Sequence, residues 1–313
     1  MIAKSLINHN IMSILLKDLD EPIIKFLELP GTVNLMQTNK YYNTIISKKE
    51  LIKEWNIMKN KTYKFPHIFI KTCEKGYIAY AKSLVARYKI DIHHNDEYVF
   101  WWNCSYGHFE IIKWLIDLGE NHGYGKFNIH NYHERAFRWS CENGHYEIAK
   151  WLIVLGENHG YGRIDIHSNS EYAFRWSCEN GYHEIAKWLI DLGENNGYTK
   201  IDIHAECEYA FTWSCIKGHH GIAKWLIDLG ENYSYGKINI HDNSEYAFKW
   251  TCIGGHHEIA KWLIDLGENH GYGRIDLRKF SKNKIEMCRI NNHHEIVKWL
   301  IDLGQNHGYE KIE

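Results

Sequence analysis

Histidines at regular spacing are the residues of this chain that most suggest chemistry. The chain has 313 residues and 22 histidines, and two groups of histidines recur in steps of 37 residues. One group follows Ile-x-Ile and the other follows glycine: His130, His167, His204 and His241, and His108, His145, His219 and His256. A structural zinc ion needs four ligands about 2 Å away. Side chains one repeat apart cannot converge on one point, so we expect no metal site.

The cysteines follow the same spacing. Five of the eight cysteines recur at one repeat position: Cys104, Cys141, Cys178, Cys215 and Cys252. Packed helices lie about 8–10 Å apart, whereas a disulfide needs Cα atoms within about 7 Å. We therefore expect no disulfide framework. The pattern predicts small, buried, reduced residues of an intracellular, cytoplasmic protein.

Other chemical motifs are weak. Residues 119–126 resemble a phosphate-binding loop, but the spacing is one residue too long and Phe127 stands where serine or threonine is needed. No Ser–His–Asp, Cys–His or paired-carboxylate arrangement stands out from the repeats, and no HExxH sequence occurs. We expect no catalytic residues, no enzymatic activity and no cofactor.

The elements that position these residues are repeats of 37 residues. Full copies begin at Ile90, Phe127, Ile164, Ile201 and Ile238, and a degraded copy begins at Ile275. In the copy at 127–163, apolar residues at helical spacing predict two helices, over 134–142 and 146–155. Gly144 is expected to form the turn between them and Gly156 to end the second. Eleven of the 13 tryptophans occupy two repeat positions, which predicts that they form the core.

Composition excludes two classes of function. The formal net charge is −2, and lysines and arginines form no continuous stripe, so we expect no nucleic-acid binding. No apolar stretch reaches the roughly 18 residues that a membrane-spanning helix needs. The N-terminal apolar run is too short for a signal peptide, and we expect no membrane association.

The repeat resembles the ankyrin repeat. The sequence from Gly144 to Gly156, Gly-His-Tyr-Glu-Ile-Ala-Lys-Trp-Leu-Ile-Val-Leu-Gly, carries the resemblance, which covers roughly residues 66–313. It implies an all-α fold, an ankyrin-type α-solenoid of helix–turn–helix repeats. The chain departs from the family in its period, 37 rather than about 33 residues. The composition resembles that of ankyrin-repeat families of large amoebal viruses.

A second departure concerns the start of the first helix. Tyr172, Ala173, Phe174 and Arg175 and their equivalents stand where the family has Thr-Pro-Leu-His. The hydrogen-bond network that the family builds from that threonine and histidine is therefore missing. We expect tryptophan packing to replace it.

The chain divides into four predicted parts. They are a small N-terminal helical module at 1–60, an incomplete first repeat at 61–89, five full repeats at 90–274 and a capping repeat at 275–313. The module resembles an F-box, which implies binding to a Skp1-like adaptor of a ubiquitin ligase. The residues that carry this resemblance are Phe26, Leu27, Pro30, Val33, Leu35, Tyr42 and Trp55. The alternative is that the module caps the open face of the first repeat.

A protein target is expected on the surface where the copies differ from each other. Three positions of the first helix change from copy to copy while the frame stays fixed. They are occupied by Trp101, Arg138, Arg175, Thr212 and Lys249, by Ser105, Glu142, Glu179, Ile216 and Ile253, and by Tyr106, Asn143, Asn180, Lys217 and Gly254. Trp101 and Tyr106 are predicted to be exposed aromatic anchors. The alternative is neutral variation on a solvated face.

These observations predict a protein–protein interaction module. With an F-box, the chain would be a substrate receptor of a Skp1–cullin-type ubiquitin ligase. The alternative is a stand-alone scaffold or decoy without a ligase link.

Overall fold

The computed structural model describes residues 65–195 and 197–306. The chain divides into two compact units, residues 1–94 and residues 95–313. In the described part of the chain every regular element is a helix, which confirms the predicted all-α repeat fold. The predicted F-box residues, from Phe26 to Trp55, lie outside the described residues.

The described part of the first unit is one pair of helices. Helix α6 spans Phe65–Glu74 and helix α7 spans Ile78–Arg87, and the two helices pack against each other. Cys73 and Ala81 are fully buried. Gly76, with φ 75°, makes the turn between the helices.

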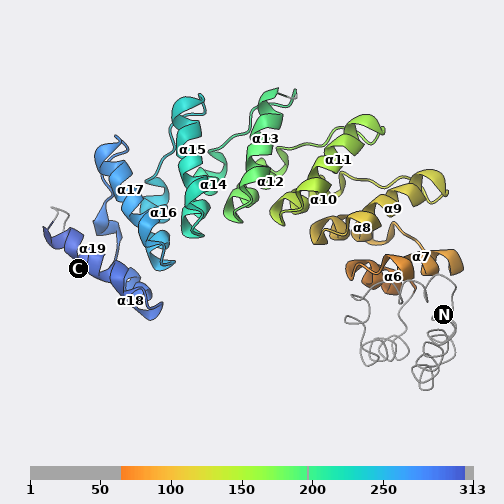
Figure 1. Ribbon diagram of the computed structural model, residues 1–313, viewed down its shortest axis with the longest axis horizontal. Helices are drawn as coiled ribbons and strands as arrows, with labels where there is room; N and C mark the ends of the chain where they lie inside the picture. Colours follow the sequence, from red (N-terminus) through yellow and green to blue (C-terminus); the bar gives the residue numbers. More distant parts are fainter. Residues whose placement is uncertain (1–64, 196, 307–313) are drawn as a thin grey trace, which may run out of the picture. The chain divides into compact units, whose positions relative to one another are not determined.

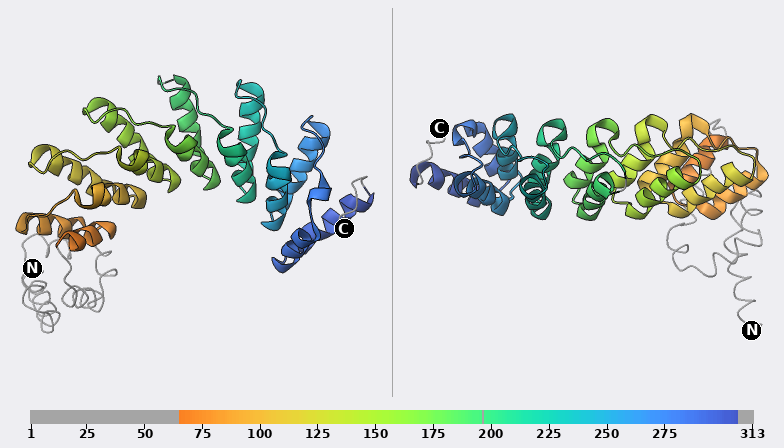
Figure 2. Two further views of the ribbon diagram at one scale, coloured as in Figure 1. Left: turned by 180° about the vertical axis from the view of Figure 1, so that it is seen from behind. Right: turned by 90° about the horizontal axis from the view of Figure 1, so that it is seen from above.

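The second unit repeats this pair, and all of its described α-helices except α18 (Lys282–Ile290) are longer than α6 and α7. The first helices of its copies are α8 (His94–Tyr106), α10 (Asn131–Glu142), α12 (Ser168–Glu179), α14 (Ala205–Ile216), α16 (Asp242–Ile253) and α18 (Lys282–Ile290). The second helices are α9 (Phe109–Asn121), α11 (Tyr146–Asn158), α13 (His183–Asn195), α15 (His220–Asn232), α17 (His257–Asn269) and α19 (His294–Asn306). First helices lie on one side of the stack and second helices on the other (Figures 1 and 2). The first helices pack against their equivalents in the neighbouring copies, and most second helices pack on the first helix of their own copy.

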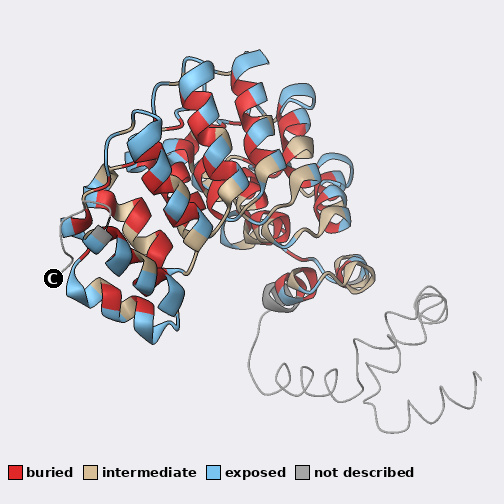
Figure 3. Cartoon of the chain, turned by 60° about the vertical axis from the view of Figure 1, so that its left-hand side comes forward, coloured by how far each residue is buried: buried red, intermediate tan, exposed pale blue. Residues whose placement is uncertain are grey.

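Phenylalanines form the centre of the stack. Phe137, Phe174 and Phe211, one on each successive first helix, are completely buried. The buried residues lie on the faces that the helices turn to each other (Figure 3). The predicted tryptophan core is wrong in this respect, because the repeated tryptophans of both helices are only half-buried. Trp188, for example, covers Phe137 from outside, with ring centroids 6.2 Å apart.

The second helix does not end at its glycine, as the sequence suggested. Helix α11 continues past Gly156 to Asn158, and Gly156 is buried inside it. A Cβ atom at Gly156 would overlap the carbonyl oxygen of Gly162, in the connector that returns across the helix. Glycine is needed here because two backbones approach closely, and not because a helix ends.

The first helices from α8 to α16 start with an unusual left-handed turn. Among the described residues, five first helices begin with three consecutive non-glycine residues at positive φ. They are 95–97, 132–134, 169–171, 206–208 and 243–245. A left-handed residue costs about 1–2 kcal/mol, so neighbouring groups must stabilise this turn. The first helix of the copy at 127–163 thus begins at Asn131, before the predicted 134.

A buried histidine–glutamate pair stabilises the turn and joins it to the next copy. Glu134, the last left-handed residue, lies 2.8 Å from Nδ1 of His130 and accepts a hydrogen bond from the backbone N–H of Asp165 in the next copy. His130 Nε2 lies 2.9 Å from the carbonyl oxygen of Tyr161, in the connector that leads to that copy. We name this arrangement the latch. The expectation that tryptophan packing replaces the family's hydrogen-bond network is wrong, because the latch does so.

The latch recurs along the stack. The other pairs are His167–Glu171, His204–Glu208 and His241–Glu245, each with Nδ1 2.8–2.9 Å from the carboxylate. The same glutamates accept hydrogen bonds from the backbone N–H groups of Asp202, Asn239 and Asp276.

The last copy shows what happens without the latch. Arg278 and Lys282 stand where the preceding copy has His241 and Glu245. The segment instead forms a short 3₁₀ helix, η1 (Leu277–Lys279), followed by α18, and none of its described residues adopts a left-handed conformation before Asn292. The left-handed turn and the glutamate therefore occur together.

Two glycine-to-alanine substitutions are expected to act in opposite directions. Gly156→Ala should lower the free energy of unfolding by about 1–3 kcal/mol, because the new methyl group collides with the connector. Gly221→Ala should raise it by up to about 1 kcal/mol, because Gly221 lies in α15 with nothing near its added Cβ. Denaturant unfolding followed by circular dichroism measures both changes. A stabilising effect of Gly156→Ala would show that the connector does not pack on the helix.

Candidate functional site

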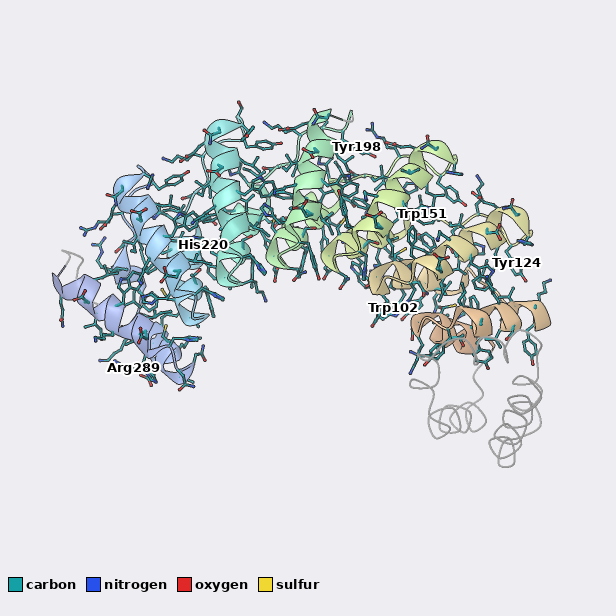
Figure 4. All side chains as sticks on the ribbon, in the orientation of Figure 1. Trp102, Tyr124, Trp151, Tyr198, His220 and Arg289 are labelled. Atoms are coloured by element: carbon teal, nitrogen blue, oxygen red, sulfur yellow. The ribbon has the colours of Figure 1, made fainter. Side chains whose placement is uncertain are left out.

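The first helices present a continuous set of aromatic side chains, which we name the aromatic band. Its members occupy two positions, four residues apart on the helix, and all are half-buried. They are Tyr98, Tyr172, Tyr209 and Tyr246, and Trp102, Trp139, Trp176, Trp213 and Trp250. In Figure 4, Trp102 lies on the side of the first helices, whereas Tyr124 and Tyr198 lie at the far ends of the second helices.

Ring contacts hold the band in place. Tyr98 stacks on Trp102 at 5.3 Å and Tyr172 stacks on Trp176 at 5.3 Å. Contacts also cross from copy to copy, as between Trp102 and Trp139 at 5.8 Å. Aromatic pairs at these distances add to the stability that burial gives. The rings therefore form a surface whose shape is largely fixed before a partner arrives.

Arg135 replaces the tyrosine of the band in one copy. Its guanidinium carbon lies 4.3 Å from the ring centroid of Tyr132, 4.6 Å from that of Trp101 and 5.1 Å from that of Trp139. The cation thus fills the space between two first helices. This contact is a cation–π interaction of the chain with itself.

The first set of predicted partner-binding residues is largely buried, so the expectation that it faces outward is wrong. Trp101 and Arg138 are 6% exposed and Arg175 is 8% exposed. Arg138 donates Nε–H to the carbonyl oxygen of His133 at 2.6 Å and Nη2–H to that of Tyr132 at 2.9 Å. These carbonyl groups belong to the left-handed turn.

Residues at the same position in the neighbouring copies also donate hydrogen bonds to the left-handed turn. Arg175 donates to Ser170 and Asn169, and Trp101 donates its indole N–H to Asp96. Thr212 is also buried, and Lys249 is half-buried. This position therefore stabilises the turn, which the sequence pattern did not reveal.

The second set of predicted residues differs in burial from copy to copy. Ser105, Glu142 and Ile216 are half-buried, whereas Glu179 and Ile253 are buried. Glu142 accepts a hydrogen bond from the Tyr172 hydroxyl at 2.8 Å, and Glu179 accepts one from the Tyr209 hydroxyl at 2.5 Å. Burial, together with the adjacent carboxylate, raises the pKa values of Tyr172 and Tyr209 far above the ordinary value of a tyrosine. Both hydroxyls therefore remain donors that join neighbouring copies.

Tyr106 is the predicted anchor that lies at the surface. Its side chain is 53% exposed, and its ring lies 5.2 Å from that of Trp102. It extends the aromatic band at the C-terminal end of α8.

The latch is an ion pair by its geometry. His130 has two acceptors beside it, the Glu134 carboxylate and the Tyr161 carbonyl group, so an imidazolium with a proton on each ring nitrogen satisfies both contacts. Burial lowers the pKa of His130, but the hydrogen bonds with Glu134 and Tyr161 outweigh burial and raise it above its ordinary 6.5. Burial also raises the pKa of Glu134, against the opposing effect of His130. The raised pKa of His130 means that its protonation contributes stability that is fully present below pH 6.5 and is lost as the pH rises through its folded pKa.

His145 behaves in the opposite way. Burial lowers the pKa of His145, although its Nε2 lies 2.9 Å from the carbonyl oxygen of Ser105. Its contribution to stability is present above pH 6.5 and is lost as the pH falls through the folded pKa.

The connectors form a second ladder that the sequence did not reveal. Lys126 lies over the ring of Tyr161 at 4.9 Å, and Lys237 lies over that of Tyr272 at 3.9 Å. Tyr272 in turn donates its hydroxyl to Glu231 at 2.7 Å. A cation, a tyrosine and a carboxylate recur at these connector positions. Their ladder therefore occupies the ends of the second helices, away from the band.

Two findings concern other kinds of site. Within residues 65–195 and 197–306, no three histidine, cysteine, aspartate or glutamate side chains come together as they would around a metal ion. Among the described helices, none has the length and apolar composition to cross a membrane.

A match to a model of a known protein family identifies the family of this chain. The model of the family of ankyrin repeats, which describes three copies, matches residues 69–164 and 211–311, more than half of the chain. The chain therefore belongs to the ankyrin-repeat family, and its repeats form a protein–protein interaction module. No curated protein matches the chain.

Proposed function

We propose that this ankyrin-repeat chain recognises a protein target through the aromatic band. The observation that carries the proposal is the row of half-buried tyrosine and tryptophan rings along the first helices. Large aromatic side chains provide much of the binding energy at protein interfaces. Rings already held by their neighbours lose little conformational entropy when a partner binds.

Differences among copies give this surface its selectivity. Around the shared rings lie Tyr106, Asn143 and Lys217, which occupy equivalent positions in three copies. An interface with common aromatic anchors and variable polar neighbours distinguishes one target from another.

The N-terminal module extends this proposal. We assign residues 1–60 to the binding of a Skp1-like adaptor, on the resemblance of Phe26, Leu27, Pro30 and their neighbours to an F-box. The chain would then connect its target to a ubiquitin ligase of the Skp1–cullin type. The buried free cysteines fit a reducing compartment, so we place the protein in the cytoplasm, which is the host cytoplasm if the chain is viral.

A double substitution at the exposed end of the band tests target recognition. Trp102→Ala with Tyr106→Ala should weaken binding of a target that co-purifies from the native cell by at least about tenfold, because it removes two aromatic anchors. Tyr233→Ala is the matched control: Tyr233 is 59% exposed but belongs to a connector, so affinity should not change. Equal binding by the double variant and the native chain, with unchanged circular dichroism, would contradict the assignment of the band.

Capture of the adaptor tests the ligase link. The intact chain should retain a Skp1-like adaptor in a pull-down, and Leu27→Asp should abolish capture because an apolar contact becomes charged. The Trp102→Ala variant should capture the adaptor normally. Failure of the folded native chain to capture any such adaptor would leave the alternative, a stand-alone scaffold or decoy.

Cutting the chain near Lys61 separates the adaptor module from a cap. If the module binds the adaptor, the remaining repeats should stay folded and monodisperse. If it caps the first repeat, the remaining repeats should expose an apolar end and aggregate.

A further inference from the structure

Three lysines near the C-terminal end of the row of first helices have no hydrogen-bond or ion-pair partner among the described residues. Lys249 belongs to α16, Lys279 to η1 and Lys284 to α18. None of these ammonium groups forms an ion pair or a hydrogen bond with another described residue. We name them, together with Trp250, the lysine patch.

Neighbouring charges do not neutralise the patch. Arg278 is paired with Asp276, with Nε and Oδ1 2.8 Å apart, and Arg289, the residue of α18 that Figure 4 labels, lies 3.1 Å from Glu286. The Glu245 carboxylate, which also faces Lys249, is engaged by the His241 latch. The acidic groups of this region are therefore already occupied.

The charges of the other two lysines both act on Lys249. Burial lowers the pKa of Lys249 below its ordinary value, and the charge of Lys284 and, less strongly, that of Lys279 lower it further, while Glu245 raises it by an amount between those two effects. Lys284 is fixed over the ring of Trp250, with Nζ 4.1 Å from the ring centroid. Like charges gathered around a half-buried ring oppose folding, and an anion that binds between them relieves their repulsion.

Equivalent cations elsewhere in the stack do have partners. Arg138 and Arg175, at the position of Lys249 in earlier copies, donate to carbonyl groups of their left-handed turns. Lys217, which follows the last residue of α14, lies 3.7 Å from Glu179. The lysine patch thus differs from the rest of the same surface.

We propose that the lysine patch binds an acidic segment of the protein target. The patch continues the aromatic band through Trp250, so one extended polypeptide can contact both. A polypeptide fits better than a nucleic acid, because a nucleic acid needs a longer track of cations and the chain as a whole has a formal charge of −2. This inference rests on the proposed function, because it names the chemistry of the same target.

Binding of a labelled oligoglutamate peptide to the full chain tests the proposal. At low salt the peptide should bind, and salt should weaken binding. The triple variant Lys249→Gln, Lys279→Gln, Lys284→Gln should bind about tenfold more weakly, since each exposed ion pair contributes modestly. The matched control is Lys113→Gln, Lys150→Gln, Lys187→Gln, which removes the same charge from lysines that already face glutamates, and it should bind like the native chain.

The contrary outcomes are distinct. No peptide binding, or equal weakening in both triple variants, would overturn the proposal. So would tighter binding of single-stranded DNA or phosphatidylserine vesicles through the same lysines. If the triple variant loses helicity, Lys279→Gln alone, at an exposed position outside any α-helix, should still weaken peptide binding.

The native target separates this inference from the proposed function. If Trp102→Ala with Tyr106→Ala abolishes target binding and the lysine triple variant does not, the proposed function stands and the lysine patch does not bind the target. If neither variant weakens target binding, the proposed function is contradicted, and the inference about the lysine patch falls with it.

Discussion

Burial removes the Glu134 carboxylate from water, so the protein itself must supply its hydrogen bonds. Groups from two copies supply them to the Oε1 atom: the His130 imidazole of the same copy and the Asp165 amide of the next, whereas Oε2 has no hydrogen-bond partner. Hydrogen bonds to charged groups contribute about 1.5–3 kcal/mol each, which is enough to offset several left-handed residues. The latch therefore fixes the conformation that begins a first helix and the position of the copy that follows.

The aromatic band depends on this constraint. A first helix that began differently would turn its tyrosine and tryptophan positions away from the shared face. Arg138 and Arg175 add to the constraint from the other side, because they bind the carbonyl groups of the left-handed turn. The surface that we assign to target recognition is thus held by buried polar groups rather than by the apolar core alone. The lysine patch lies where the latch ends, with Lys282 in place of the buried glutamate.

The repeat, its two helices and the family could be predicted from the sequence, because apolar spacing and the Gly-His-x-Glu-Ile pattern recur in register. The residues that form the exposed face could not be predicted from the sequence. Arg138 and Arg175 varied between copies and carried charge, so they read as surface residues, although they are buried as donors to backbone carbonyl groups. Such donors leave no apolar signature. The tryptophans recurred and were large, so they read as core, whereas the smaller Phe137 and Phe174 fill the centre.

The latch was also hidden in the sequence, although both of its residues recur. The histidine and the glutamate are four residues apart, which on an ordinary right-handed helix would predict an exposed pair. Only the left-handed turn brings the glutamate beneath the next copy. Recurrence gave no clue: Glu97, Glu134, Glu171, Glu208 and Glu245 recur at a spacing of 37 residues, but so do the exposed Glu110, Glu147 and Glu184.

The pKa of His130, followed by NMR in the native chain and in Glu134→Gln, tests most directly whether a buried ion pair joins the copies. The account predicts that His130 titrates above its ordinary 6.5 in the native chain. Without the carboxylate, burial should bring its pKa below that value, while His145, whose pKa burial lowers in both chains, should not change. A His130 pKa at or below 6.5 in the native chain, unchanged by Glu134→Gln, would contradict the account.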